Sequence, residues 1–114
     1  MKANEIRIGN LFTVNGFTMY VEAIFKDTVY FDFEGEGNIK DLIPIPLTEE
    51  ILNKAGFESH YHGFIRNERI FIEETLNGWN IGFFGITMRE VRYIHDLQNL
   101  IFALTGEEIK IELE

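Results

Sequence analysis

The sequence holds one pair of side chains whose type and spacing suit metal binding. His60 and His62 lie two residues apart in ESHYH, a segment typical of a β-strand, and alternate residues of a strand point to the same face. Two imidazoles on one face can share a zinc ion. Glu58 would lie about 13 Å from His62 along the strand, so a further ligand such as His95 would have to come from elsewhere. Histidines that face solvent explain the pair without a ligand, and we predict no metal site.

The acidic stretch DFEGEGN at residues 32–38 partly imitates a calcium-binding loop. Acidic residues at its first, third and fifth positions are followed by Gly37 at the sixth, as in an EF-hand. The twelfth position, where an EF-hand has glutamate, is Ile43, and the flanking residues are typical of strands rather than helices. We therefore expect an acidic hairpin tip.

Catalytic signatures are missing from the sequence. It contains no G-x-S-x-G, H-E-x-x-H, P-loop or G-x-G-x-x-G pattern, and it has no cysteine. Glu73 and Glu74 would point to opposite faces of a strand, so they would not form a carboxylate pair. We predict a non-catalytic protein that needs no cofactor. An enzyme whose site is assembled from scattered residues is an alternative.

The charge of the chain bears on its partners. It has 19 acidic and 10 basic residues, a net charge of −9, which argues against direct binding to nucleic acids or to anionic membranes. The segment MKANEIRIGN lacks the apolar region of a signal peptide, and no apolar run approaches the roughly 20 residues that span a bilayer. We expect a cytoplasmic protein with no membrane partner. An acidic decoy that mimics DNA and occupies a basic groove of another protein is a second alternative function.

Turn residues divide the first 46 residues into short strands. Asn15-Gly16 predicts a two-residue hairpin that pairs Val14 with Phe17, and Gly9-Asn10 indicates a bend. Strands are expected at 5–14, 17–25, 28–33 and 39–43. Residues 1–46 therefore predict a small SH3-like β-lobe. The stretch RIGNLFTVNG also resembles the opening of small SH3-like barrels.

The second lobe, residues 47–114, is expected to contain two helices and a hairpin. Thr48 is the predicted N-cap of a short helix that ends at Gly56. Asn77-Gly78 predicts a second tight hairpin, with Leu76 opposite Trp79. The other predicted elements are strands at 57–65, 86–93 and 107–113 and a helix at 94–105 that stops at Gly106. The fold class is α+β, and the two lobes are expected to share one core.

Phe102 does not fit the apolar stripe of the second predicted helix. The stripe, at 100° per residue, consists of Tyr93, Ile94, Leu97, Leu100, Ile101 and Leu104. Phe102 lies to one side of it, in line with His95 and Asn99. One interpretation is that Phe102 packs inside the fold, under the C-terminal strand. The other is that His95, Asn99 and Phe102 form a contact surface for a protein partner or for a second copy of the chain.

Three stretches, MKANEIRIGN, IPIPLTEE and IHDLQNLIFALTGEE, resemble a family of small proteins from Bacteroides-type bacteria and their phages or mobile elements. The resemblance spans most of the chain. The resemblance implies a cytosolic protein carried by a phage or mobile element, but it supplies no activity and no catalytic residues. Because catalytic motifs are also missing, we expect a small accessory protein that acts by protein–protein interaction.

Overall fold

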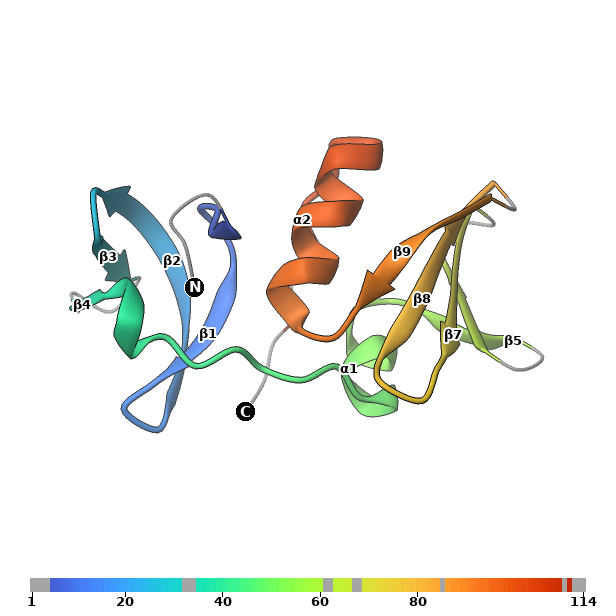
Figure 1. Ribbon diagram of the computed structural model, residues 1–114, viewed down its shortest axis with the longest axis horizontal. Coiled ribbons are helices and arrows are strands. Elements are labelled where there is room, and N and C mark those ends of the chain that lie inside the picture. The colour runs from blue at the N-terminus through green and yellow to red at the C-terminus, as the bar shows by residue number, and fades with distance from the viewer. Residues whose placement is uncertain are drawn as a thin grey trace. The chain divides into compact units, whose positions relative to one another are not determined.

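The computed structural model describes residues 5–31, 35–60, 63–66, 69–84, 86–109 and 111, with only the backbone for His60. These residues form two antiparallel β-sheets and two α-helices (Figure 1), in agreement with the expected α+β class. Neither α-helix is long and apolar enough to cross a membrane.

The chain divides into two compact units. The first combines residues 1–45 with 93–109, and the second consists mainly of residues 46–92. Helix α2 (Ile94–Thr105) therefore belongs to the first unit, whereas the sequence-based division at residue 46 assigned it to the second lobe. Its apolar residues Ile94, Leu97 and Ile101 are fully buried, and α2 packs against strand β1.

The sheet of the first unit has the order β1 (Leu11–Val14), β2 (Phe17–Phe25), β3 (Thr28–Phe31) and β4 (Glu36–Asn38). The Asn15-Gly16 hairpin is confirmed, because Val14 pairs with Phe17 and the two turn residues have φ angles of 50° and 83°. Positive φ at both positions is what a type I′ turn requires. The core residues of this unit alternate along the strands: Phe12, Val14, Val21, Val29 and Phe31, covered by Ile6, Ile39 and Leu42.

Two of the predicted strands of this unit differ from the structure, one in its extent and one in its type. Strand β1 begins at Leu11 rather than at residue 5, because the chain bends at Gly9, whose φ is +95°. The strand expected at 39–43 is instead the 3₁₀-helix η2 (Ile39–Asp41). The side chain of Asn38 accepts the N–H of Lys40 at 3.0 Å, and this cap favours a helical turn over an extended strand. Of the candidate calcium loop, residues 32–34 lie outside the described residues, while Glu36 and Gly37 belong to β4.

Helix α1 (Glu49–Lys54) of the second unit has both predicted ends. The hydroxyl of Thr48 accepts the N–H of Ile51 at 3.2 Å, and Gly56 has a φ of +92°. The N–H of Phe57 donates to the carbonyl of Leu52 at 3.0 Å, the long bond of a Schellman motif. Both ends are therefore fixed by residues within or next to the helix.

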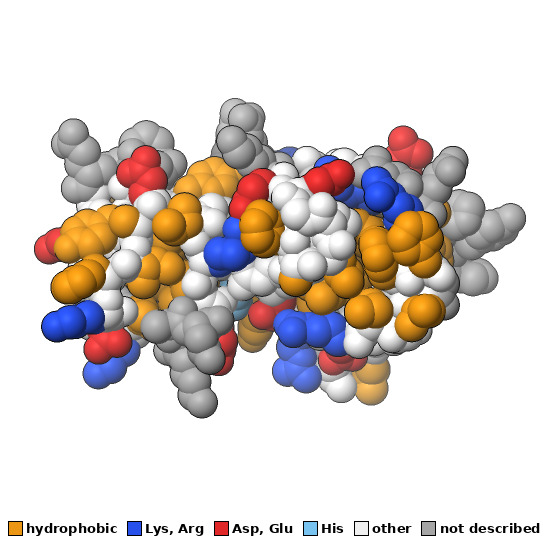
Figure 2. All heavy atoms as spheres, turned by 90° about the horizontal axis from the view of Figure 1, so that it is seen from above, with side chains coloured by type: hydrophobic (Ala, Val, Ile, Leu, Met, Phe, Trp, Pro, Cys, Tyr) orange, Lys and Arg blue, Asp and Glu red, His pale blue; other side chains and the backbone are white. Residues whose placement is uncertain are grey.

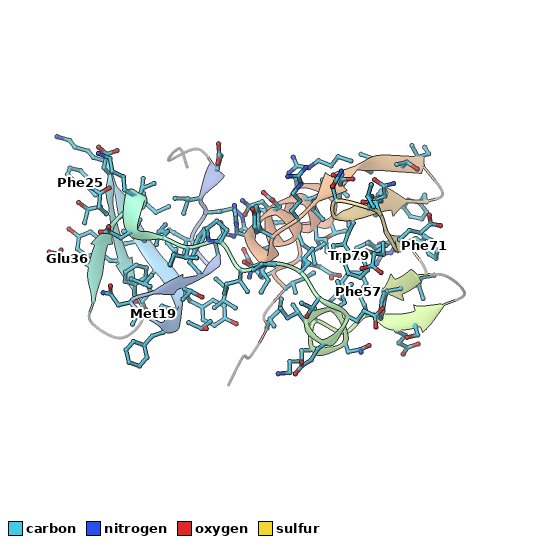
Figure 3. All side chains as sticks on the ribbon, turned by 60° about the horizontal axis from the view of Figure 1, so that its bottom comes forward. Met19, Phe25, Glu36, Phe57, Phe71 and Trp79 are labelled. Atoms are coloured by element: carbon cyan, nitrogen blue, oxygen red, sulfur yellow. The ribbon has the colours of Figure 1, made fainter. Side chains whose placement is uncertain are left out.

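The second sheet has the order β5 (Glu58–His60), β6 (Gly63–Arg66), β7 (Ile70–Glu74), β8 (Trp79–Phe83) and β9 (Ile86–Val91). Strand β9 confirms the strand expected at 86–93. Phe57 and Trp79 lie on the side of this sheet where α1 packs (Figure 3), and both are buried. The indole N–H of Trp79 donates to the carbonyl of Leu47 at 3.3 Å, which ties the sheet to the segment that precedes α1.

The strand predicted at 57–65 is wrong, because the chain turns back within it. Strands β5 and β6 form a hairpin in which Glu58 pairs with Ile65 and His60 with Gly63. Gly63 permits a close approach to β7, since a Cβ there would lie 2.1 Å from the carbonyl oxygen of Ile72. Sequence periodicity could not reveal this need for a bare backbone.

The predicted register of the Asn77-Gly78 hairpin is also wrong. Glu74 pairs with Trp79, and the N–H of Thr75 donates to the carbonyl of Gly78 at 2.8 Å, so the turn residues are Leu76 and Asn77. Gly78 is not among the residues with positive φ. A Cβ on Gly78 would lie 2.8 Å from the carbonyl oxygen of Val91, so this glycine serves close packing against β9 rather than the turn. Leu76 is left 98% exposed.

The strand predicted at 107–113 is not present in its described part. Residues 107–109 and Ile111 have no strand assignment, while 110 and 112–114 lie outside the described residues. Ile109 and Ile111 are nevertheless buried, so the apolar pattern of this segment indicated burial correctly.

Candidate functional site

Helix α2 carries the predicted contact residues, and both of its ends are defined. At its start the N–H of Ile94 donates to the carbonyl of Ile45 at 2.8 Å, while Tyr93 provides no side-chain cap. At its end Gly106 has a φ of +76° and its N–H donates to the carbonyl of Phe102 at 2.8 Å. Gly106 thus ends the helix, as the sequence predicts.

The buried face of α2 is wider than its apolar stripe. His95 and Gln98 are buried together with Ile94, Leu97 and Ile101, whereas the stripe residues Leu100 and Leu104 are only partly buried. The helix therefore turns two polar side chains into the first unit. Each of these needs partners, because a buried polar group without a hydrogen bond destabilises the fold.

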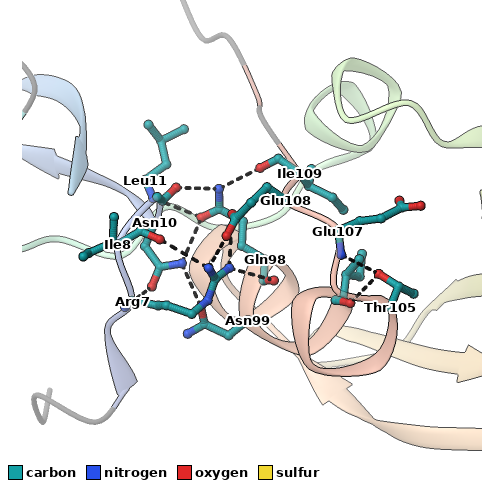
Figure 4. A network of polar contacts seen from close by, with 12 residues as sticks. Arg7, Ile8, Asn10, Leu11, Gln98, Asn99, Thr105, Glu107, Glu108 and Ile109 are labelled. Atoms are coloured by element: carbon teal, nitrogen blue, oxygen red, sulfur yellow. Dashed lines mark hydrogen bonds and ion pairs between the residues drawn. The ribbon is translucent and has the colours of Figure 1, made fainter. Parts of the chain in front are cut away.

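Gln98 meets this need with four contacts (Figure 4). Its side-chain oxygen accepts the N–H of Leu11 at 3.0 Å and lies 3.4 Å from the amide nitrogen of Asn10. Its amide nitrogen donates to the carbonyls of Gly9 at 3.1 Å and Ile109 at 3.0 Å. One side chain thus joins α2 to the bend before β1 and to the segment that follows the helix.

Asn99 continues this network toward solvent. Its side-chain oxygen accepts a hydrogen bond from the amide of buried Asn10 at 2.8 Å and a longer one from the Nε of Arg7 at 3.3 Å. Its own amide donates to the carbonyl of Glu5 at 3.0 Å. The N–H of Arg7 donates to the Asn10 side chain at 2.7 Å. The segment at 5–10 is therefore held on α2 by paired amides.

Arg7 lies over the ring of Phe102, with 4.1 Å between the guanidinium carbon and the ring centroid. Both terminal nitrogens of the guanidinium contact the carboxylate of Glu108, the second at 3.3 Å (Figure 4). A guanidinium over an aromatic face is an attractive arrangement, and the paired carboxylate fixes its orientation. Phe102 remains 38% exposed. Arg7, Asn99, Phe102 and Glu108 together are called the Arg7–Phe102 surface below.

The predicted contact residues do not all reach the surface. Asn99 and Phe102 are joined through Arg7, but His95 is only 3% exposed and lies inside the first unit. Its ring packs against Phe12, 4.7 Å between centroids, and is stacked on Tyr93 at 5.9 Å. Burial lowers the pKa of His95, although Asp96 and Glu5 act in the opposite direction. His95 is thus part of the support of the surface and not of its contact area.

The candidate metal ligands cannot be placed. His62 and the side chain of His60 lie outside the described residues. Within the described part of the chain, no group of three or more potential ligands comes together.

Other hydrophobic side chains also reach the surface of the protein among charged ones (Figure 2). The large exposed ones, apart from Phe102, are Ile8, Phe17, Phe25, Tyr30, Ile43, Leu76, Phe84, Ile86 and Met88. Phe102 differs from Phe17, at the Asn15-Gly16 turn, in having a cation held over its ring by further side chains.

No protein-family model, curated protein or solved structure matches the chain. Membership of a family of small phage-borne proteins therefore stays a prediction. The residues of the chain itself are the basis for the function proposed below.

Sequence reasoning did not identify Arg7, Asn10 and Gln98 as parts of this site. Gln98 stands four residues after Ile94 and three before Ile101, so it falls beside the apolar stripe. A polar residue next to the apolar stripe of a helix could have indicated a buried hydrogen-bond network. No such indication exists in the sequence for Arg7 and Asn10, because their partner Asn99 lies about ninety positions away.

Proposed function

We propose that this chain is a small, non-catalytic accessory protein that binds another protein through its Arg7–Phe102 surface. The observation that carries the proposal is the partly exposed Phe102 ring held under the guanidinium of Arg7. Aromatic residues and arginine are enriched in the energetically important parts of protein interfaces. Here Arg7 and Phe102 lie side by side, and Arg7 is held in place by hydrogen bonds to Asn99 and Glu108.

The contacts that order Arg7 and Asn99 are the second argument for this surface. Arg7 contacts the Asn99 and Glu108 side chains, and Asn99 is fixed in turn by Asn10. Side chains that are already ordered lose less conformational entropy when they bind, so more of the contact energy remains for affinity.

The proposal can be tested by affinity capture with paired variants. The tagged full-length chain, Phe102→Ala and the matched control Phe17→Ala are produced in the organism that encodes the protein. Phe17 is 67% exposed and belongs to the same unit, so both variants remove a surface ring. We expect one specific protein to be captured by the parent chain and by Phe17→Ala, and lost with Phe102→Ala. Equal capture by all three would refute the proposal.

A second copy of the chain is one possible occupant of the surface, and analytical ultracentrifugation identifies it. In that case the parent chain sediments as a dimer and Phe102→Ala as a monomer. A monomeric parent chain that captures a different protein supports a heterologous partner.

The acidic charge supports a second candidate function, a decoy that mimics DNA. Among the described residues of the first unit, eight are acidic (Glu5, Glu22, Asp27, Glu36, Asp41, Asp96, Glu107 and Glu108) and three are basic (Arg7, Lys26 and Lys40). If the captured protein binds nucleic acid, duplex DNA should displace it, and binding should weaken steeply with salt. A complex that resists both DNA and salt contradicts the decoy.

We further propose that the first unit is an SH3-like barrel and that the protein is a cytoplasmic product of a phage or mobile element. Support for the barrel comes from Ile43, which follows η2 and exchanges two backbone hydrogen bonds with Thr13 of β1, at 3.0 and 2.9 Å. Backbone pairing between the end of this segment and the first strand is what closes a sheet into a barrel. The cytoplasmic and phage assignments rest on the sequence alone.

A further inference from the structure

His95 is enclosed by aromatic rings of its own unit. Phe12, which is fully buried in the core, lies 4.7 Å away between centroids, and Tyr93 stacks on the imidazole with an angle of 13° between the planes. Phe12 belongs to β1, and His95 is in the first turn of α2. The imidazole is therefore part of the contact between this strand and this helix.

The polar atoms of the ring are poorly matched to a positive charge. Nδ1 is buried without a hydrogen-bond partner among the described residues, and Nε2 lies 3.5 Å from a carboxylate oxygen of Asp96. The first turn of a helix also has positive electrostatic potential, which disfavours a cation. A protonated ring would bury a charge with one N–H unpaired, whereas the neutral ring has a single N–H that can be directed at Asp96.

Charged groups around the ring act in opposite directions. The carboxylates of Asp96, on the same helix, and Glu5, on the segment before β1, favour the protonated ring, while burial disfavours it. Phe12, from β1, packs against the imidazole with an uncharged ring. Burial is the larger influence, and it lowers the pKa of His95 below its ordinary value of 6.5.

We propose that His95 makes the packing of α2 on β1 pH-sensitive. The neutral imidazole holds the helix against Phe12, and protonation on mild acidification loosens α2 in the first unit. Strands β7 and β8 belong to the second unit.

The direction of the effect follows from proton linkage. Because the pKa of His95 is lower in the folded state, the unfolded chain binds the proton more readily. The stabilisation is complete above the unfolded pKa of about 6.5, is lost as the pH falls through the folded pKa, and changes no further below it. The equilibrium for opening α2 should increase about tenfold for each pH unit that separates the two pKa values.

The experiment combines NMR titration with hydrogen exchange on the full chain between pH 7.5 and 5. The background is the double variant His60→Gln, His62→Gln, which leaves His95 as the only imidazole. Protection factors, corrected for the intrinsic pH dependence of exchange, are measured for α2 amides and, as an internal control, for β7 and β8. We expect His95 to titrate below 6.5 and α2 protection to fall on acidification while β7 and β8 stay constant.

The variant His95→Phe keeps an aromatic ring between Phe12 and Tyr93 but cannot be protonated. Its α2 protection should not depend on pH. If this variant does not fold, the titration of His95 in the parent chain still tests the proposal. A His95 pKa at or above 6.5, or α2 protection that is constant while the ring titrates, would overturn the proposal.

Discussion

The side-chain oxygen of Gln98 accepts the backbone N–H of Leu11 at 3.0 Å, although the two residues are 87 positions apart in the sequence. Gln98 is completely buried, and its amide also satisfies the carbonyls of Gly9 and Ile109. One glutamine therefore fixes β1 and the segments around it on α2. The support of the proposed contact surface depends on this side chain, since Arg7 and Asn99 are ordered by the same strand bend and helix.

Replacing Gln98 by alanine should destabilise the first unit strongly. The substitution removes the acceptor for the N–H of Leu11 and the donor to the carbonyls of Gly9 and Ile109, and each buried polar group left unsatisfied costs about 1–3 kcal/mol. We expect a loss of about 3 kcal/mol in the free energy of unfolding, measured by urea denaturation followed by helical circular dichroism. Asn53→Ala, which removes an exposed amide on α1, is the control and should change it by less than about 0.5 kcal/mol. Equal effects of the two variants would show that the Gln98 contacts contribute little.

The hydroxyl of Thr48 should stabilise α1 by capping its first turn. Thr48→Ala removes the acceptor for the N–H of Ile51, and loss of such a cap costs about 1 kcal/mol. Thr48→Asp keeps an acceptor and should retain most of the stability. Trp79 lies in the same unit, so its fluorescence during denaturation reports the effect. The cap is unimportant if the alanine and aspartate variants have the same midpoint.

Gly78→Ala tests the corrected account of the second hairpin. A methyl group at this position would meet the carbonyl oxygen of Val91 at 2.8 Å and Cγ of Arg92 at 3.1 Å. Strands β8 and β9 must then separate, with an expected loss of about 1–3 kcal/mol of stability in the second unit.

The neighbouring variant Leu76→Ala changes a side chain that is 98% exposed and serves as the control for Gly78→Ala. Its denaturation midpoint, measured by Trp79 fluorescence, should match that of the parent chain. A Gly78→Ala protein as stable as the Leu76→Ala protein would contradict the close approach of Gly78 to β9.

Elements specified by neighbouring residues could be predicted from the sequence. The hairpin at Asn15-Gly16 and the ends of α1 at Thr48 and Gly56 depend on backbone conformations and caps that lie within a few positions of one another. The Asn77-Gly78 hairpin has the same dipeptide, yet its turn is displaced by one residue. The reason is non-local, because the space at Gly78 is set by Val91 on another strand.

The candidate site could be predicted only in part. Phe102 was identified because it lies off the apolar stripe of its helix, and the structure leaves it partly exposed. The buried positions of His95 and Gln98 follow from partners such as Phe12 and Leu11, which no local pattern connects with α2. Arg7 was missed for the same reason. Which polar residues become buried depends on which distant segments pack together. The spacing of residues along one helix does not contain that information.

The central claim, that the Arg7–Phe102 surface contacts a protein partner, is tested most directly by photo-crosslinking. The photoreactive residue p-benzoylphenylalanine replaces Phe102 in one chain and Phe17 in another, and each chain is irradiated in the cells that encode the protein. We predict one discrete crosslinked product from position 102, which disappears when Arg7→Ala is added, and none from position 17. The absence of any product from position 102, or the same product from both positions, would contradict the account.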